Sequence, residues 1–276
     1  MREVGDDICL ILCLAPKVGH AAFARVVNEC RVRGIEPEAL LRMGADRLRE
    51  EFRLHPHSAR ALANGATELR RRAHLLRQKV GDKPVRLVTR DSPLYPRALE
   101  EFCRTPPGYL FLYGNPKVLN NPTFCVIASR GATREDLDRV SRIVEEQTLE
   151  GKTLITGSNT PAYRAAAVVP LRWGAPRIVV VERGLFSALG DDLERELFPA
   201  ARLWRYRFDP TTDLVISFSR PDEGAVKSDS TRRDEIVVGL SQEVYAVRIR
   251  KGGNMERLMA RVEERGRTLV RLPSLK

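Results

Sequence analysis

The chain has 276 residues, 43% of them hydrophobic, so it is long enough to form one large domain with a filled core and a smaller second domain. Its longest apolar runs, residues 8–15 and 178–181, are far shorter than the roughly 18 residues that a membrane-spanning helix requires, and Asp6 and Asp7 argue against a secretory signal. We therefore expect a soluble, cytoplasmic protein with no membrane partner.

The formal net charge of +11 favours a polyanionic partner, because surface Lys and Arg side chains release counterions from a nucleic-acid backbone. The chain also has 36 acidic residues beside its 47 basic ones, so an ordinary solvated surface is the alternative explanation. The charge by itself leaves both interpretations open.

The cysteines form no CxxC pair and are odd in number, which argues against a zinc module and against a disulfide framework. Cys9 and Cys13 lie one helical turn apart, so a metal pair is the alternative there, but free cysteine is commonly buried and we favour both as small core residues. The five cysteines are Cys9, Cys13, Cys30, Cys103 and Cys125.

Residues 7–80 have apolar side chains at three- and four-residue spacing, interrupted by Pro and Gly, which predicts helices throughout. We interpret residues 1–80 as a small all-helical module of the SAM or helix-hairpin-helix type. Residues 14–25 loosely resemble the helix-hairpin-helix signature, although a structural or partner-docking role is favoured over DNA contact. The basic run at 68–79 predicts a solvated helix face, with the wall of a basic groove as the alternative.

From residue 85 onward, short apolar runs alternate with helical patterns of about a dozen residues, which predicts right-handed crossovers and a parallel sheet. Strands are expected at 85–88, 109–113, 124–127, 153–156, 178–181, 213–217 and 243–247, and helices at 134–150, 161–173 and 254–265. Residues 218–233 are polar and predict a long loop. We therefore predict that residues 81–276 form an extended Rossmann-like α/β domain, with a mostly parallel sheet and flanking helices.

The expected strand at 124–127 ends in the polar turn Ser129-Arg130-Gly131, the position at which such sheets bind ligands. Thr133 and Asp136 have the spacing of a capping pair at the start of the next helix. Backbone amides and the Arg130 guanidinium are therefore predicted to converge on an anion, with phosphate as the expected ligand.

Groups for acid-base or nucleophilic chemistry are scarce in the predicted α/β domain. The four histidines lie within residues 20–74, so this domain has no histidine to act as a base or a metal ligand. Ser129 has no G-x-S-x-G context, and the absence of GxGxxG and GxxxxGK[ST] sequences disfavours a dinucleotide site and a P-loop. We predict no catalysis, no cofactor and no metal.

Residues 204–208 alternate aromatic and basic side chains, in the order Trp204-Arg-Tyr-Arg-Phe208. The rings of Trp173, Trp204, Tyr206 and Phe208 are candidates for stacking on nucleic-acid bases. An edge strand with one buried face gives the same alternation and is the favoured interpretation.

The order of five motifs resembles the DNA-processing protein A (Smf) family over roughly the whole chain. The similar segments are Asp91–Leu99, Thr105–Gly114, Val126–Thr133, Gly151–Gly157 and Arg233–Ser241. Each motif is short, but their shared order makes the combination specific.

This resemblance implies an extended Rossmann domain that binds single-stranded DNA, forms a homodimer and helps to load a RecA-type recombinase during natural transformation or recombination. Arg130 is predicted to hold a phosphate, beside a backbone cradle, and further cations are predicted to extend the positive surface. The complete predicted set is Ser129, Arg130, Gly131, Gly157, Ser158, Lys227, Arg232, Arg233 and Lys251.

The chain also departs from the family pattern. The loop at 158–164 lacks the family's Asp and His, and Asp234 and Glu235 stand where the family has Asn and Arg. A carboxylate in place of a guanidinium is expected to repel phosphate at close range. The first alternative is therefore a Rossmann-type sensor of a nucleotide-derived ligand. The second is a nucleotide-processing hydrolase, whose glycine-rich motifs the chain lacks.

Overall fold

The computed structural model describes residues 6–225 and 229–272. The chain divides into two compact units, the first comprising residues 1–95 and 107–110 and the second comprising residues 96–106 and 111–276. The boundary predicted after residue 80 stays a prediction. None of the helices in the described ranges is long and apolar enough to cross a membrane.

The first unit is helical up to residue 80, as the apolar spacing predicts. Its elements are α1 (Asp6–Leu14), α2 (His20–Arg33), η1 (Pro37–Arg42), α3 (Ala45–Phe52), α4 (Pro56–Asn64), α5 (Ala66–Val80) and β1 (Val85–Thr89). Gly34 ends α2 with a φ of 63° and donates its N–H to the carbonyls of Cys30 and Arg31. The basic side chains of the run at 68–79 are exposed, whereas Leu69 and Ala73 are buried, so α5 has the predicted solvated face.

Strands and helices alternate in the second unit, where the predicted fold class is confirmed. The elements are α6 (Ala98–Phe102), β2 (Tyr109–Gly114, of which residues 111–114 belong to this unit), η2 (Pro116–Asn120), β3 (Thr123–Ile127), α7 (Arg134–Leu149), β4 (Thr153–Thr156), α8 (Pro161–Arg172), β5 (Arg177–Val181), α9 (Leu185–Leu189), η3 (Pro199–Leu203), β6 (Leu214–Ser217), α10 (Asp229–Leu240), β7 (Glu243–Ala246), α11 (Asn254–Glu264) and β8 (Thr268–Arg271).

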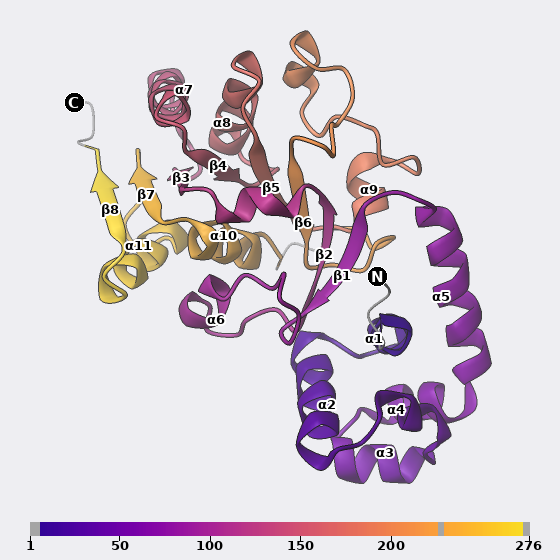
Figure 1. The fold of residues 1–276 in the computed structure, drawn as a ribbon. Helices are drawn as coiled ribbons and strands as arrows, with labels where there is room; N and C mark the ends of the chain where they lie inside the picture. The colour runs from indigo at the N-terminus through magenta and orange to yellow at the C-terminus, as the bar shows by residue number, and fades with distance from the viewer. Residues whose placement is uncertain (1–5, 226–228, 273–276) are drawn as a thin grey trace. The chain divides into compact units, whose positions relative to one another are not determined.

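Within the described residues the strands form one sheet of eight, in the order β1-β2-β6-β5-β4-β3-β7-β8. β2 runs antiparallel to β6, and the pairings from β6 through β8 are parallel. Figure 1 shows α7 and α8 on one face of this sheet and α10 and α11 on the other. β3, β4 and β5 are buried along their whole length, as expected for strands covered by helices on both faces.

Some elements differ from the sequence-based expectations. Helix α10 begins at Asp229, so the last part of the predicted polar loop at 218–233 is helical. The edge-strand interpretation of residues 204–208 is wrong, because Arg207 contributes only an isolated bridge to Arg195. Phe208 is buried while Tyr206 on the same side of the alternation is exposed, so the segment has no continuous buried face.

Of the two cysteines predicted to lie in the core, Cys13 is buried and Cys9 is half-buried. Cys30, Cys103 and Cys125 are also buried, and all five are free thiols. Burial raises the pKa of the Cys30 thiol to about 11 and that of Cys103 and Cys125 to about 12.

Candidate nucleic-acid interface

The path of the chain reverses beside β3. After β3 and β4 the chain passes through α7 and α8 on one face of the sheet, whereas α10 on the other face leads back to β7, which lies on the far side of β3 (Figure 1). Doubly wound sheets bind ligands outside the carboxyl ends of their strands at such a switch point. The loops that leave β3 and β7 are therefore the expected position of a ligand.

Ser129 joins these two loops. Its backbone N–H donates to the carbonyl of Arg248 at 2.7 Å, and its hydroxyl accepts from the backbone N–H of Arg250 at 2.8 Å. Residues separated by more than a hundred positions in the chain are thus held side by side. Ser129 is a predicted site residue, and in this geometry it fixes the backbone that carries the neighbouring cations.

The joined loops carry several exposed cations. Arg130 after β3, and Arg250 and Lys251 after β7, are exposed, and their side chains make no hydrogen bond or ion pair with any residue in 6–225 or 229–272. Gly131 and Gly252 have φ values of 89° and 73°, and open space surrounds the position of a Cβ at each. The glycines leave the backbone accessible, so a phosphate can approach both the amides and the cations.

The N-terminus of α7 lies at the same edge of the sheet and is closed by its own residues. Thr133 and Asp136 form the predicted capping pair: the Thr133 hydroxyl accepts from the Asp136 N–H, and the Asp136 carboxylate accepts from the Thr133 N–H at 2.8 Å. Arg248 also donates to this carboxylate, at 3.1 Å. Arg248 is therefore partly neutralised, and Asp136 connects the helix to the loop after β7.

Three of the predicted phosphate contacts, Gly157, Ser158 and Arg233, are buried. Arg233 is only 2% exposed, and its guanidinium binds Glu182 at 3.2 Å and Asp234 at 2.8 Å while it stacks on the Tyr163 ring at 5.2 Å from the centroid. The Ser158 hydroxyl donates to Glu182 at 3.0 Å. We refer to Ser158, Tyr163, Glu182, Arg233 and Asp234 as the Arg233 cluster.

The packing of the Arg233 cluster also explains why position 157 is a glycine. A Cβ at Gly157 would lie 2.7 Å from atoms of the Tyr163 ring and 2.9 Å from Cδ of Arg233, closer than real contacts allow. Gly157, Ser158 and Arg233 are thus brought together, as expected for one site, but their polar groups face protein partners rather than solvent. Their contact with phosphate stays a prediction.

The two carboxylates that replace family residues are also paired with protein groups. Burial raises the pKa of Asp234, and the carboxylate accepts hydrogen bonds from Arg233, from the Tyr163 hydroxyl at 3.1 Å and from Asn254 at 3.2 Å. Glu235 forms an ion pair with Arg261 and accepts the Arg104 N–H at 3.2 Å. Both carboxylates are thus engaged by protein groups, and the repulsion of phosphate expected from them stays a prediction.

Two further predicted cations lie away from these loops or outside the described residues. Arg232 is half-buried, lies over Phe218 at 5.8 Å from the ring centroid and donates to the carbonyl of Thr105 at 3.4 Å. Lys227 lies outside the described residues. The contribution of both residues to phosphate binding stays a prediction.

Arg248 and Arg250 are the site residues that sequence reasoning missed. The signal that identifies them is the run Arg248-Ile-Arg-Lys-Gly-Gly253, which directly follows a strand and joins alternating cations to a glycine pair. It has the same form as the turn after β3, from which Arg130 was predicted. Among the described residues, no group of three or more His, Cys, Asp and Glu side chains is placed to hold a metal ion.

A doubly wound α/β protein with unpaired cations at its switch point is suited to binding anions. The chain belongs to the DNA recombination-mediator protein A family, whose model matches residues 86–274, more than half of the chain. The family resemblance of the sequence motifs is thereby confirmed. No curated protein sequence matches this chain.

The solved structures that share the fold include two DNA processing proteins. DNA processing protein A from Streptococcus pneumoniae has a TM-score of 0.72 and 18% identity, over 100% of this chain and 88% of that chain. DNA processing protein A from Helicobacter pylori, solved for its single-stranded DNA binding mode, has a TM-score of 0.53 and 16% identity, over 70% of this chain and 83% of that chain.

Replacing Asp136 with Ala should lower the free energy of unfolding by about 1–2 kcal/mol, because the capping pair and the contact with Arg248 are lost together. Burial opposes ionisation of Asp136, but the hydrogen bonds from Thr133 and Arg248 outweigh it and lower the pKa. Such a carboxylate stabilises the fold only when it is ionised, so the loss should be complete above about pH 4 and should shrink at lower pH.

Urea denaturation at pH 7 and at pH 3 measures this difference. Asp138→Ala is the matched control, because Asp138 is an exposed carboxylate on the same helix and should change stability by less than about 0.5 kcal/mol. An Asp136→Ala loss of equal size at both pH values would contradict the assigned role of the ionised carboxylate.

Arg233→Ala should lower the free energy of unfolding by about 3–5 kcal/mol, because Glu182 and Asp234 would stay buried without a cation. Chemical denaturation measures the loss, with the exposed Arg265 changed to Ala as the control. A loss below about 1 kcal/mol would show that the Arg233 cluster does not hold these loops.

Proposed function

We propose that this chain is a non-catalytic, single-stranded-DNA-binding protein that holds the DNA backbone at the switch point. The observation that carries the proposal is the set of exposed, unpaired cations Arg130, Arg250 and Lys251, on two loops that Ser129 joins. Cations without protein partners are free to replace the counterions of a polyanion. Contacts of this kind position a nucleic-acid strand without reading its sequence.

Membership in the recombination-mediator family supports a DNA ligand, as does the fold shared with the Helicobacter pylori protein, whose structure was solved for single-stranded DNA binding. On the same basis we propose that the protein works in the cytoplasm as a homodimer. Its role there would be to help load a RecA-type recombinase onto DNA in transformation or recombination.

The site residues support binding rather than catalysis. The chain has no histidine beyond residue 74, so no imidazole on these loops can act as a general base. The Ser129 hydroxyl accepts the Arg250 N–H, which gives it a role in holding the loops together. Apart from Thr133, which caps α7, the remaining polar side chains of the loops are cations, which bind phosphate without reacting with it.

The predicted residues divide into two groups in this proposal. Ser129, Arg130, Gly131 and Lys251, together with the added Arg248 and Arg250, would contact the phosphates directly. Gly157, Ser158 and Arg233 would act from beneath by fixing the loops, and Arg232 and Lys227 would extend the positive surface. The buried group would therefore affect affinity by holding the loops in place, whereas the exposed cations Arg130, Arg248, Arg250 and Lys251 would affect it through their charge.

Arg130→Ala and Lys251→Ala should each weaken the binding of labelled oligo-dT roughly ten-fold, about 1.4 kcal/mol, and equally for other base compositions. Each should also reduce the slope of log affinity against log salt by about 0.7, the value for one phosphate contact on a single strand. Fluorescence anisotropy over a salt series measures both quantities.

Arg265→Ala is the matched control for charge, because this exposed arginine follows the opposite end of α11 from the switch point and should leave both quantities unchanged. Binding that is insensitive to salt, or variants that bind as wild type, would contradict the proposal. Tight binding of a mononucleotide in a thermal-shift panel, without affinity for oligo-dT, would instead establish a small-ligand sensor.

A further inference from the structure

A second group of exposed residues lies at the opposite edge of the sheet from the switch point. Both tryptophans of the chain are exposed there, Trp173 by 53% and Trp204 by 42%, and Tyr206 is 73% exposed. Large aromatic side chains are usually mostly buried in a folded domain. Three exposed aromatic side chains at one edge of the same sheet therefore indicate a binding surface.

The chain path places these residues at the amino ends of the strands. Helix α8 ends at Arg172, immediately before β5 begins at Arg177, so its last turn lies at the amino end of β5. Residues 196 and 205 reach the same edge, because Glu196 and Arg205 bind Arg177 and Asp213, which stand at the amino ends of β5 and β6.

Two of the exposed rings make a cation–π contact with an arginine. The guanidinium of Arg172 lies 5.2 Å from the ring centroid of Trp204, and that of Arg202 lies 5.9 Å from the ring centroid of Tyr206. In the described ranges neither guanidinium makes a hydrogen bond or an ion pair, so their donors stay available to a ligand. We refer to Arg172, Trp173, Arg202, Trp204 and Tyr206 as the amino-end surface.

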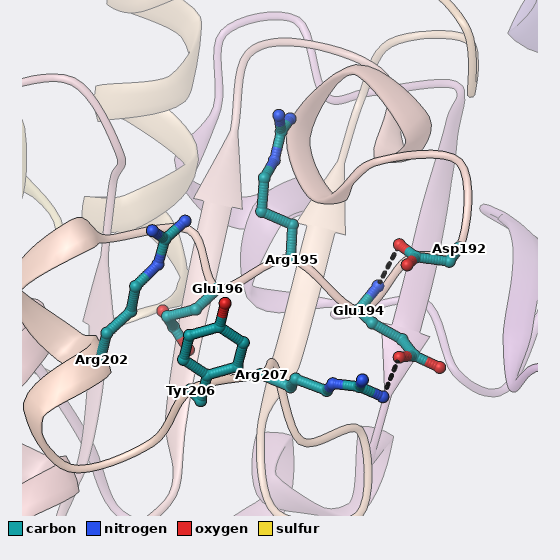
Figure 2. Close-up of a pocket in the computed structure, with 7 residues that line it drawn as sticks. All are labelled: Asp192, Glu194, Arg195, Glu196, Arg202, Tyr206 and Arg207. Carbon is teal, nitrogen blue, oxygen red and sulfur yellow. Dashed lines mark hydrogen bonds and ion pairs between the residues drawn. The ribbon is translucent and has the colours of Figure 1, made fainter.

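A small pocket adjoins this surface. Its volume is about 250 Å³, below the range of about 300–1,000 Å³ that drug-sized ligands occupy, so it suits a single ring rather than a whole cofactor. Figure 2 shows Tyr206 and Arg202 on one side of the pocket and Arg207, joined to Glu194, on the other. The lining residues are Asp192, Glu194, Arg195, Glu196, Arg202, Tyr206 and Arg207.

The carboxylates of the pocket are already engaged by protein groups. Glu194 pairs with Arg207 at 2.6 Å, and the buried Glu196 pairs with Arg177 at 2.8 Å. Asp192 accepts the backbone N–H of Glu194 at 3.1 Å. Negative charge in the pocket is thus offset, and the two stacked arginines remain the unpaired charges of the neighbouring surface.

Buried ion pairs hold this segment in place. Arg177 is fully buried and donates to Asp213, to both oxygens of Glu196 and to the Ala167 carbonyl, each at 2.8 Å. Phe208 is also buried and anchors the end of the segment. The aromatic rings between these anchors are therefore presented on a fixed backbone, which lowers the entropy cost of binding.

We propose that the amino-end surface is a second contact surface for single-stranded DNA, on which bases stack on Trp204 and Tyr206 while Arg172 and Arg202 contact the flanking phosphates. Aromatic rings interleaved with cations are the combination that binds single strands without sequence preference. This inference rests on the proposed function for its ligand, but on different residues. A DNA strand bound at the switch point would continue to this surface only if it is long enough.

Tryptophan fluorescence reports directly on the amino-end surface, because both tryptophans belong to it. Titration with long oligo-dT should quench tryptophan fluorescence, since bases would stack on Trp204. Tyr206→Ala and Trp204→Ala should each weaken long oligo-dT about ten-fold in fluorescence anisotropy. Leu203→Ala is the matched control: Leu203 lies in the same segment and is 81% exposed, but an aliphatic side chain offers no ring for stacking, so affinity should change less than two-fold.

The outcomes separate the two DNA surfaces. The second surface would be overturned if long oligo-dT does not quench the wild-type fluorescence and Tyr206→Ala does not change affinity. If the Arg130→Ala, Lys251→Ala double variant also loses binding, the switch point stays supported. Quenching that persists in the double variant would support the second surface on its own. A wild-type protein that binds no oligo-dT would overturn both.

A protein partner is the other class of molecule that exposed aromatic residues could serve. In that case Leu203, the most exposed large hydrophobic residue among those that the structure describes, should matter as much as Tyr206. A concentration-dependent shift of tryptophan emission without DNA, removed by Leu203→Ala, would show self-association through this surface and overturn the proposal.

Discussion

One buried guanidinium, that of Arg233, joins the elements that meet at the carboxyl edge of the sheet. It binds Glu182 after β5, stacks on Tyr163 of α8 and, through Asp234, reaches Asn254 at the start of α11. Removal of such a cation from water is costly unless its partners are present. The loops that follow β4 and β5 therefore depend on the same ion pairs for their positions. The close contact with Gly157 shows how little room the arrangement leaves.

This dependence explains why the chain tolerates carboxylates at Asp234 and Glu235, where its family has other residues. A carboxylate on the exposed loops would oppose the binding of phosphate. Directed inward, Asp234 completes the Arg233 cluster, and Glu235 neutralises Arg261. The carboxylates of this short helical segment are thus paired with buried or partly buried arginines, whereas Arg130, Arg250 and Lys251 are exposed.

The strands and the switch-point turn could be predicted because they depend on local pattern. Buried runs such as the one at 124–127 and a polar turn with Arg130 are visible in a few consecutive residues. The pairing of β3 with β7 joins segments that are far apart in the chain, so the hydrogen bond between Ser129 and Arg250 could not be predicted from the sequence. A sequence likewise shows the charge of Arg233 but not its burial, and the partly exposed β8 lacked the apolar run of a core strand.

The buried thiols have a consequence for the chemistry of the chain. Only the thiolate form of cysteine attacks alkylating reagents, and burial keeps Cys30, Cys103 and Cys125 protonated near neutral pH. These thiols become reactive only when the structure around them opens. Because Cys30 lies in the first compact unit and the other two lie in the second, the rate at which each is modified reports the opening of one unit separately from the other.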